Sequence, residues 1–281
     1  MSTDIAGARD AWEQSRRWIT TSTGANISGV GTGTGPPEVV LLHDVARSAL
    51  SWQPLTRVLG LPAVALDLPG HGRSSWTRSG DYSPRRTGRP LAEAVRSFAP
   101  QHRLLVGVGV GALSALAAAG RLGENVGRLV LIDALPGTLA DAHPSWPWPS
   151  PDFSGPEEAA SWLRAHSPWL ADAADPAASA QREVAHELAE RTDGRWAWRH
   201  HVGALPETGP EAFDDPRLWD RLTELTIPPL LVRAENGPVS DAHTERFRAT
   251  GGEVLTVPGT SHHVVTDRPD ELADALRGAP R

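Results

Sequence analysis

Asp44, Asp133 and His262 each follow an apolar run whose residue types predict a buried strand. In an open parallel sheet, ligands bind at the carboxyl ends of the strands, where such residues would lie. An imidazole at that edge could act as a general acid or base, and a neighbouring carboxylate could hold it in one tautomer. The alternatives are a hydrogen-bonded structural histidine at 262 and an aspartate at 133 that caps a turn.

The stretch Gly107-Val108-Gly109-Val110-Gly111 lies between a predicted strand and the predicted helix 112–122. A strand, a sharp glycine-flanked turn and a helix form the elbow that exposes a serine nucleophile in the pattern Gly-x-Ser-x-Gly. Here the middle residue is Gly109, so the attacking hydroxyl is missing. The nearest hydroxyl along the chain, Ser114, lies inside the predicted helix. The alternating glycines also resemble a dinucleotide-binding turn, but the surrounding sequence does not fit that motif.

Strands that alternate with helices predict an α/β fold with a mostly parallel sheet and helices on both faces. The predicted strands are 17–23, 25–31, 38–43, 63–68, 103–107, 128–132, 229–233 and 253–257. The predicted helices are 48–59, 89–98, 112–122, 241–250 and 269–277.

The alternation stops between 139 and 219, where no run of buried-strand type occurs. This interval holds helical patches at 157–165 and 180–190 and seven of the 11 Trp residues. We therefore expect a core formed by 1–138 and 220–281, and a helical, Trp-rich cap formed by 139–219. The tryptophans would mainly pack the cap, and Trp146 and Trp148 are candidates to line a substrate pocket.

Four motifs in order resemble the α/β-hydrolase superfamily over most of the chain. They are the segment Leu41-Leu42-His43-Asp44, the segment Asp67-Leu68-Pro69-Gly70-His71-Gly72-Arg73-Ser74, the glycine-rich elbow, and the segment Val257-Pro258-Gly259-Thr260-Ser261-His262. The resemblance implies an α/β-hydrolase fold with an eight-stranded sheet. It also implies that His262 is the catalytic histidine and that Gly109 marks a vacant nucleophile position.

Further site residues follow from the same resemblance. The oxyanion donors would be the backbone amides of Val45 and Val110. The loop that usually carries the acid has Gly237 at the expected place. Some members of the family take the acid from the strand end where Asp133 lies, so the resemblance makes Asp133 a candidate partner of His262 and Glu235 a weaker one.

Asp44 replaces the usual glycine of the oxyanion loop, and a carboxylate there would repel a developing oxyanion. Either Asp44 points elsewhere, or the pocket no longer stabilises an anion, or Asp44 is itself an acid–base group. His43 and Asp44 are also candidates for substrate binding.

Composition excludes several function classes. The formal net charge of −7 argues against a nucleic-acid surface, and no cysteine is present to form a disulfide or a thiolate metal site. The pair His200-His201 has neither a further ligand residue at i+4 nor a nearby cluster of carboxylates, so it does not predict a metal site. We expect a cytoplasmic protein with no membrane segment that takes a small-molecule substrate or ligand and needs neither a metal nor an organic cofactor.

Three functions remain open at this level. The first is an enzyme in which His262 carries out non-covalent chemistry on a small, largely apolar substrate, as a lyase, isomerase, cyclase or water-mediated hydrolase. The second is a ligand-binding protein without turnover. The third is an esterase-type hydrolase with a displaced nucleophile.

Overall fold

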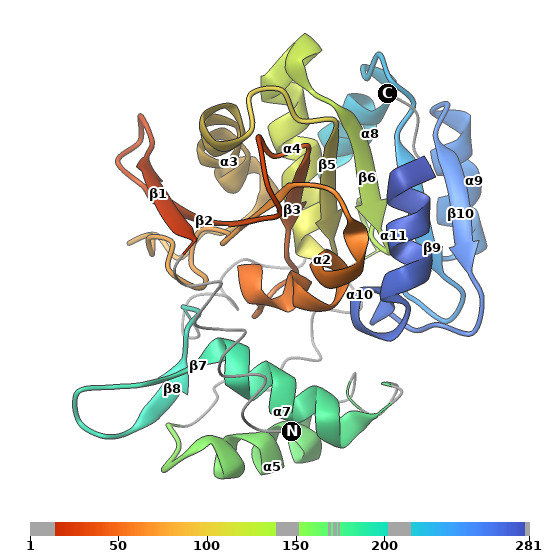
Figure 1. Cartoon of the computed structure of the whole chain (residues 1–281). Coiled ribbons are helices and arrows are strands. Elements are labelled where there is room, and N and C mark those ends of the chain that lie inside the picture. The colour runs from red at the N-terminus through yellow and green to blue at the C-terminus, as the bar shows by residue number, and fades with distance from the viewer. Residues whose placement is uncertain are drawn as a thin grey trace.

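A computed structural model describes residues 15–138, 152–167, 170, 173, 175–201 and 215–278. An eight-stranded sheet runs through it in the order β1-β2-β4-β3-β5-β6-β9-β10 (Figure 1). β1 and β2 are antiparallel to their neighbours, and the other six strands are parallel to one another. The strands are β1 (Arg16–Thr20), β2 (Asn26–Thr32), β3 (Val39–Leu42), β4 (Ala63–Leu66), β5 (Leu104–Val108), β6 (Arg128–Ile132), β9 (Leu230–Ala234) and β10 (Glu253–Val257).

Helices cover both faces of this sheet, which is therefore apolar on both sides, as parallel sheets are. One face packs against α3 (Pro84–Phe98), α4 (Val110–Leu122), α8 (Pro216–Thr223) and α9 (Asp241–Ala249). The other face packs against the 3-10 helix η1 (Ala49–Trp52), α2 (Gln53–Leu59), α10 (Val264–Asp267) and α11 (Pro269–Gly278). This is the predicted α/β-hydrolase fold, and all eight predicted strands are present.

A second layer lies beyond the carboxyl ends of the parallel strands (Figure 1). It contains α5 (Pro156–His166), α7 (Pro176–Glu187), and an antiparallel pair formed by β7 (Leu188–Glu190) and β8 (Trp196–Trp198). Phe153, Leu163, Val184 and Trp198 belong to its apolar cluster. This layer falls within the interval for which we predicted a cap.

The helix predicted over 180–190 was too long. α7 ends at Glu187, and the chain continues as β7, which turns back into β8 at Gly194 with a φ of 78°. The sequence pattern missed this hairpin because each strand has only three residues. Trp219, also counted in the predicted cap, lies in α8 and packs in the core cluster that contains α4.

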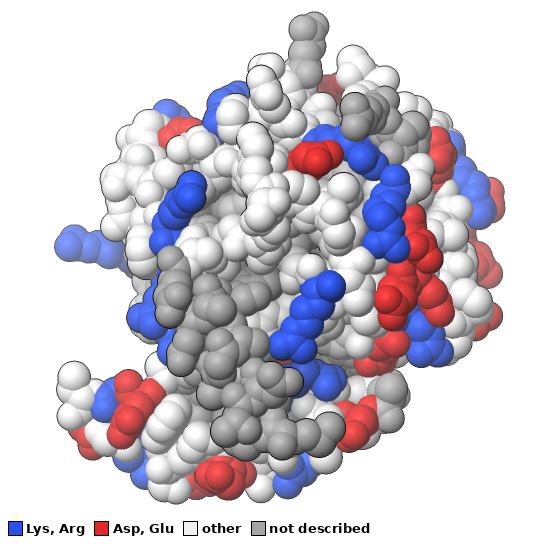
Figure 2. All heavy atoms as spheres, in the orientation of Figure 1, with Lys and Arg blue, Asp and Glu red and all other residues white. Residues whose placement is uncertain are grey.

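Acidic and basic side chains are interspersed on the face shown in Figure 2, with acidic ones most numerous toward α11 and β10. Across the described residues, no helix combines the length and the apolar character needed to cross a bilayer.

Candidate active site

Gly109 lies between the end of β5 and the first residue of α4, at the predicted elbow. Its φ of 56° and ψ of −125° are values that strain any residue with a Cβ. The flanking glycines allow neighbouring backbone segments to approach the elbow closely. A Cβ at Gly107 would overlap with the backbone of Gly111, and a Cβ at Gly111 would overlap with the carbonyl of His43. The elbow therefore keeps its backbone shape although no nucleophilic side chain stands on it.

The space above Gly109 is filled by the carboxylate of Asp44. A Cβ built on Gly109 would overlap with Cγ, Oδ1 and Oδ2 of that side chain. The position that we predicted to be vacant is thus occupied by a group from the neighbouring loop, and it leaves no room there for a water or a substrate atom.

The Asp44 carboxylate is held by the two predicted oxyanion donors. The amides of Val45 and Val110 each donate to Asp44 Oδ1 at 2.8 Å. Val110 is also the first residue of α4, so the positive end of the helix dipole faces the same oxygen. Of the alternatives for Asp44, the one in which its side chain points elsewhere is wrong. The expected repulsion does not arise, because the carboxylate is itself the anion in the site.

His262 joins Asp44 to Asp133. Its Nε2 lies 3.0 Å from Asp44 Oδ2, and its Nδ1 lies 2.8 Å from Asp133 Oδ2. The Asp133 side chain is fully buried, whereas those of Asp44 and His262 are 21% and 28% exposed. The part of the cluster that solvent or a substrate can reach is therefore the Asp44–His262 pair, and the buried Asp133 holds the imidazole from its other nitrogen.

Asp133 reaches His262 from the end of β6, in a left-handed conformation with a φ of 48°. Its Oδ1 also accepts a hydrogen bond at 3.1 Å from the amide of Ala234, the last residue of β9. Asp133 therefore links the ends of β6 and β9 as well as contacting the imidazole. A Cβ on Gly237 would overlap with this carboxylate. Glu235 instead accepts a hydrogen bond from the amide of Gly259 at 2.7 Å. The geometry thus selects Asp133 as the partner of His262.

These contacts fix the charges of the cluster. Burial alone would lower the pKa of His262, but the hydrogen bonds and negative charges of Asp133 and Asp44 outweigh it and raise the pKa to about 10. Burial would raise the pKa of Asp44, yet His262 and the amides of Val110 and Val45 lower it to about 2. At neutral pH the resting site therefore holds an imidazolium between two carboxylates.

His43, a candidate for substrate binding, has a structural role. It is fully buried; its Nδ1 donates to the carbonyl of Asp44 at 2.7 Å, and its Nε2 accepts from the amide of Leu68 at 2.9 Å. Burial lowers its pKa to about 4, so the ring is neutral. Trp146 and Trp148 lie outside the described residues. Ser114 is buried in α4 beside Thr87.

Glu187 and His71 hold the loop that carries Asp44, and our reading of the sequence missed the former. The Glu187 carboxyl group accepts hydrogen bonds from Ser48, and His71 accepts one from the amide of Ala46. His71 belongs to a motif that we had singled out, whereas Glu187 carries no motif. Across the described residues, no group of three or more His, Asp or Glu side chains is arranged to hold a metal ion.

Comparisons with known proteins agree with this architecture. The model of the Alpha/beta hydrolase family matches residues 39–275. Esterase Rv0045c of Mycobacterium tuberculosis is 33% identical over 273 residues, which cover 90% of this chain and 85% of the relative. Lipase LipV of the same organism is 27% identical over 260 residues, covering 87% of this chain and 93% of that protein.

Solved structures give the same result. A crystal structure of Rv0045c superposes with a TM-score of 0.77 at 28% identity and covers 94% of this chain and 89% of its own. That of E-2-(acetamidomethylene)succinate hydrolase has a TM-score of 0.78 at 22% identity, covers 93% of this chain and 97% of its own, and shows a shared fold only. Together these similarities support a function of the hydrolase type.

Proposed function

Since the chain belongs to the α/β-hydrolase family, we propose that it is a hydrolase of small molecules in which the Asp44 carboxylate replaces the serine hydroxyl as nucleophile. One observation carries this proposal. Asp44 Oδ1 occupies the site of the two oxyanion amides, while Asp44 Oδ2 faces His262 at 3.0 Å. Carboxylates are established protein nucleophiles that form covalent ester intermediates.

The same geometry argues against attack on a substrate carbonyl. Stabilisation of such an oxyanion needs donors within about 3 Å of the developing charge. The amides of Val45 and Val110 already bind Asp44 Oδ1, so a substrate oxygen cannot use them while Asp44 is in place. The reacting atom of the substrate is therefore a saturated carbon that bears a leaving group.

The carboxylate of Asp44 and the imidazolium of His262 suit the first step of such a reaction, which is nucleophilic substitution at the saturated carbon. Asp44 Oδ2 attacks the saturated carbon, and a carbon–oxygen bond forms while the bond to the leaving group breaks. The departing group takes the electron pair and accepts the proton of His262 Nε2. The products of this step are a neutral alkyl ester on Asp44 and a neutral imidazole, which Asp133 holds by its hydrogen bond to Nδ1.

Loss of the Asp44 charge then converts His262 from an acid into a base, because that charge helps to keep its pKa raised. His262 takes a proton from water as the water oxygen bonds to Cγ of Asp44, and Oδ1 becomes an oxyanion between the two amides. Collapse breaks the bond between Cγ and the alkyl-bearing oxygen, which leaves as an alcohol with the proton from His262. The new carboxylic acid returns its proton to His262, which restores the ion pair.

This route defines a substrate class. It comprises small, largely apolar molecules with a leaving oxygen on a saturated carbon, such as alkyl esters cleaved at the alkyl–oxygen bond and strained cyclic ethers. The esterase and lipase names of the relatives support hydrolysis of an ester-like bond.

A second candidate is non-covalent proton transfer by His262, as in a lyase, an isomerase or a cyclase. The exposure of the imidazole, 28%, and its orientation by Asp133 favour this candidate. A ligand-binding protein without turnover is the third outcome that the following experiment can return.

The test is turnover of a panel of esters, lactones and epoxides in H2(18)O, followed by mass spectrometry of the peptide that contains Asp44. The covalent route transfers one water oxygen to Asp44 in each cycle, and Asp44→Asn abolishes turnover. The control variant Asp274→Asn, on the exposed face of α11, keeps turnover and labelling at Asp44. Labelled product with an unlabelled Asp44 would establish the non-covalent route, and thermal stabilisation by a ligand without turnover would establish a binding protein.

A further inference from the structure

Loop 44–49, which leads from the end of β3 into the first residue of η1, holds five consecutive amides in hydrogen bonds. Val45 donates to Asp44 Oδ1, Ala46 to His71 Nε2, Arg47 to the Asp44 carbonyl, Ser48 to Glu187 Oε1, and Ala49 to Asp67 Oδ1. Ala46 adopts a φ of 57°, which is rare for a residue with a Cβ. Such a backbone persists only where its surroundings fix it. The hydrogen bonds to these five amides therefore determine where Asp44 and the Val45 amide lie.

One of these acceptors comes from the second layer. Glu187, the last residue of α7, accepts from the amide of Ser48 at 2.9 Å and from its hydroxyl at 3.1 Å, across 139 residues of chain. Only 2% of Glu187 is exposed, so the contact is shielded from water. Ser48 in turn caps η1 by accepting a hydrogen bond from the amide of Leu50. Glu187 thus contacts the residue that caps η1, where loop 44–49 leads into that helix.

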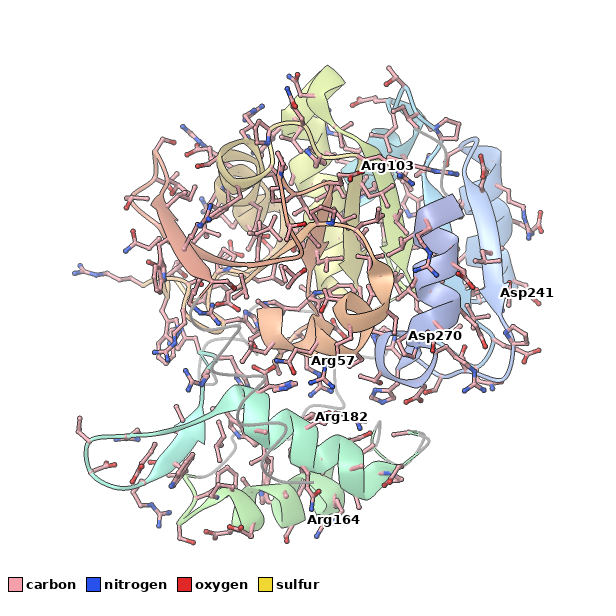
Figure 3. The ribbon with its side chains drawn as sticks, viewed as in Figure 1. Arg57, Arg103, Arg164, Arg182, Asp241 and Asp270 are labelled. Carbon is pink, nitrogen blue, oxygen red and sulfur yellow. The ribbon has the colours of Figure 1, made fainter. Side chains whose placement is uncertain are left out.

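The same helix makes a second contact with this loop. Glu183, one turn before Glu187, forms an ion pair with Arg47, and the two side chains are 11% and 17% exposed. Figure 1 shows α7 lying beneath α2, and Figure 3 places Arg182 of α7 below Arg57 of α2. Two acidic side chains one turn apart on the same helix therefore hold the loop that carries Asp44.

We propose that Glu187 is a positioning residue, which from α7 fixes loop 44–49 and so sets the Asp44 carboxylate and the Val45 amide against His262. This inference rests on the proposed function of Asp44. It makes the docking of α7 on the core a condition for the active arrangement of the site.

The proposal implies a pH dependence. Burial raises the pKa of Glu187 to about 8, with Asp67 and Glu183 adding to the rise and Arg47 and Ser48 opposing it. A raised pKa in the folded state means that the stabilising contribution of the carboxyl is complete below its ordinary pKa of 4.5 and is lost as pH rises through about 8. Above that pH the buried carboxylate favours hydration, which weakens the docking of α7.

Two ion pairs and three imidazoles also lie close to Glu187 and the loop that it holds. Asp67 pairs with Arg16 at 2.5 Å, and Arg47 pairs with Glu183. His43, His71 and His200 are buried, and burial keeps the pKa of each ring below its ordinary value. These imidazoles therefore stay neutral between pH 6 and pH 9.

The test compares Glu187→Gln and Glu187→Ala with Glu190→Gln, a control at an exposed glutamate of β7. The readouts are kcat and KM from pH 6 to pH 9, and the low-field NMR signals of the two ring N–H protons of His262. The control keeps wild-type values. Glu187→Gln resembles the protonated acid, so it keeps kcat and loses the decline in activity near pH 8. Glu187→Ala lowers kcat about tenfold or more, because misplaced groups react slowly, and broadens the Nε2 proton signal while the Nδ1 signal persists.

Unchanged kcat and an unchanged Nε2 signal in Glu187→Ala would overturn the proposal, as would a decline near pH 8 that persists in Glu187→Gln. Where Glu187→Ala does not fold, Glu187→Gln alone decides through its pH profile. The NMR readout does not require turnover. A wild-type protein without activity but with an Nε2 signal that depends on Glu187 would reject the proposed function and keep this inference.

Discussion

The carboxylate of Asp44 occupies the volume that a side chain at Gly109 would require. The two positions belong to different segments, the loop after β3 and the elbow after β5, which pair as neighbouring parallel strands. A second pair repeats the relationship at the other end of the imidazole, where Asp133 fills the volume that a side chain at Gly237 would require. Both carboxylates of the site thus come from a strand next to the one that carries the corresponding glycine.

The first pair predicts that a serine at 109 is tolerated only when Asp44 is removed. Gly109→Ser alone adds a side chain that overlaps with Asp44 and places a Cβ at a φ of 56°. Overpacking and backbone strain of this kind each cost about 1–3 kcal/mol. We expect a lower free energy of unfolding in urea for the single variant and a partial recovery for the double variant Gly109→Ser/Asp44→Gly.

The double variant also reports on chemistry. It would leave the amides of Val45 and Val110 unoccupied and place a hydroxyl beside His262, the arrangement of a serine hydrolase. We expect labelling by a fluorophosphonate probe in the double variant and none in the wild-type chain. Labelling of the wild type would reveal another nucleophile and contradict the assignment of Asp44.

The second pair predicts that Gly237→Ala displaces the Asp133 carboxylate and loosens His262. Because Asp133 is fully buried, its displacement leaves a buried charge without its partner, and we expect a loss of about 1–3 kcal/mol. Gly31→Ala is the matched control, since a Cβ there meets no atom within 4 Å. Equal denaturation midpoints for the two variants would refute this account of position 237.

Charge pairing predicts how stability depends on pH. The pKa of His262 is raised, so the contribution of its ion pairs is complete below the ordinary pKa of 6.5 and is lost as pH rises through about 10. The pKa of Asp44 is lowered, so its contribution is present above 3.8 and is lost as pH falls through about 2. Melting temperatures should therefore fall as pH rises toward 10.5. Glu187 contributes to the decline near pH 8, so Asp44→Asn should flatten the part above pH 9. An equally steep decline above pH 9 in Asp44→Asn would show that another group titrates.

Much of this arrangement could be predicted from the sequence, because motifs report backbone positions. The elbow at Gly109, the strand that ends at Asp133 and the amides of Val45 and Val110 are set by local turn geometry and by strand order. The orientation of the Asp44 side chain is not, because a rotamer depends on the space that another segment leaves open. The motif therefore identified the missing hydroxyl, and the structure identified the group that fills its place.

Contacts between segments that are distant in the chain could not be predicted from the sequence for a similar reason. Glu187 meets Ser48 across 139 residues, and neither residue belongs to a motif of known chemistry. The acid partner of His262 remained undecided in the sequence because a turn cap and a catalytic acid predict the same residue type at position 133. In the structure one carboxylate oxygen of Asp133 faces His262, and the other accepts from the amide of Ala234 in β9, which is a contact between distant segments and not a cap of the local turn.

Removal of Asp44 alone should convert its place into a binding site for a small external carboxylate. In Asp44→Gly the amides of Val45 and Val110 lose their acceptor, and His262 loses one of its two anionic partners. Formate carries the same charged group as the missing side chain and fits where that side chain was. Two convergent amides at a helix N-terminus together with an imidazolium bind such an anion favourably.

We expect formate to raise the melting temperature of Asp44→Gly in proportion to the logarithm of its concentration once the site is nearly saturated, as linkage requires, and to leave the melting temperature of the wild type unchanged. Chloride at the same ionic strength separates this effect from screening. Equal responses of the two proteins to formate would mean that the Asp44 carboxylate is not what satisfies these donors.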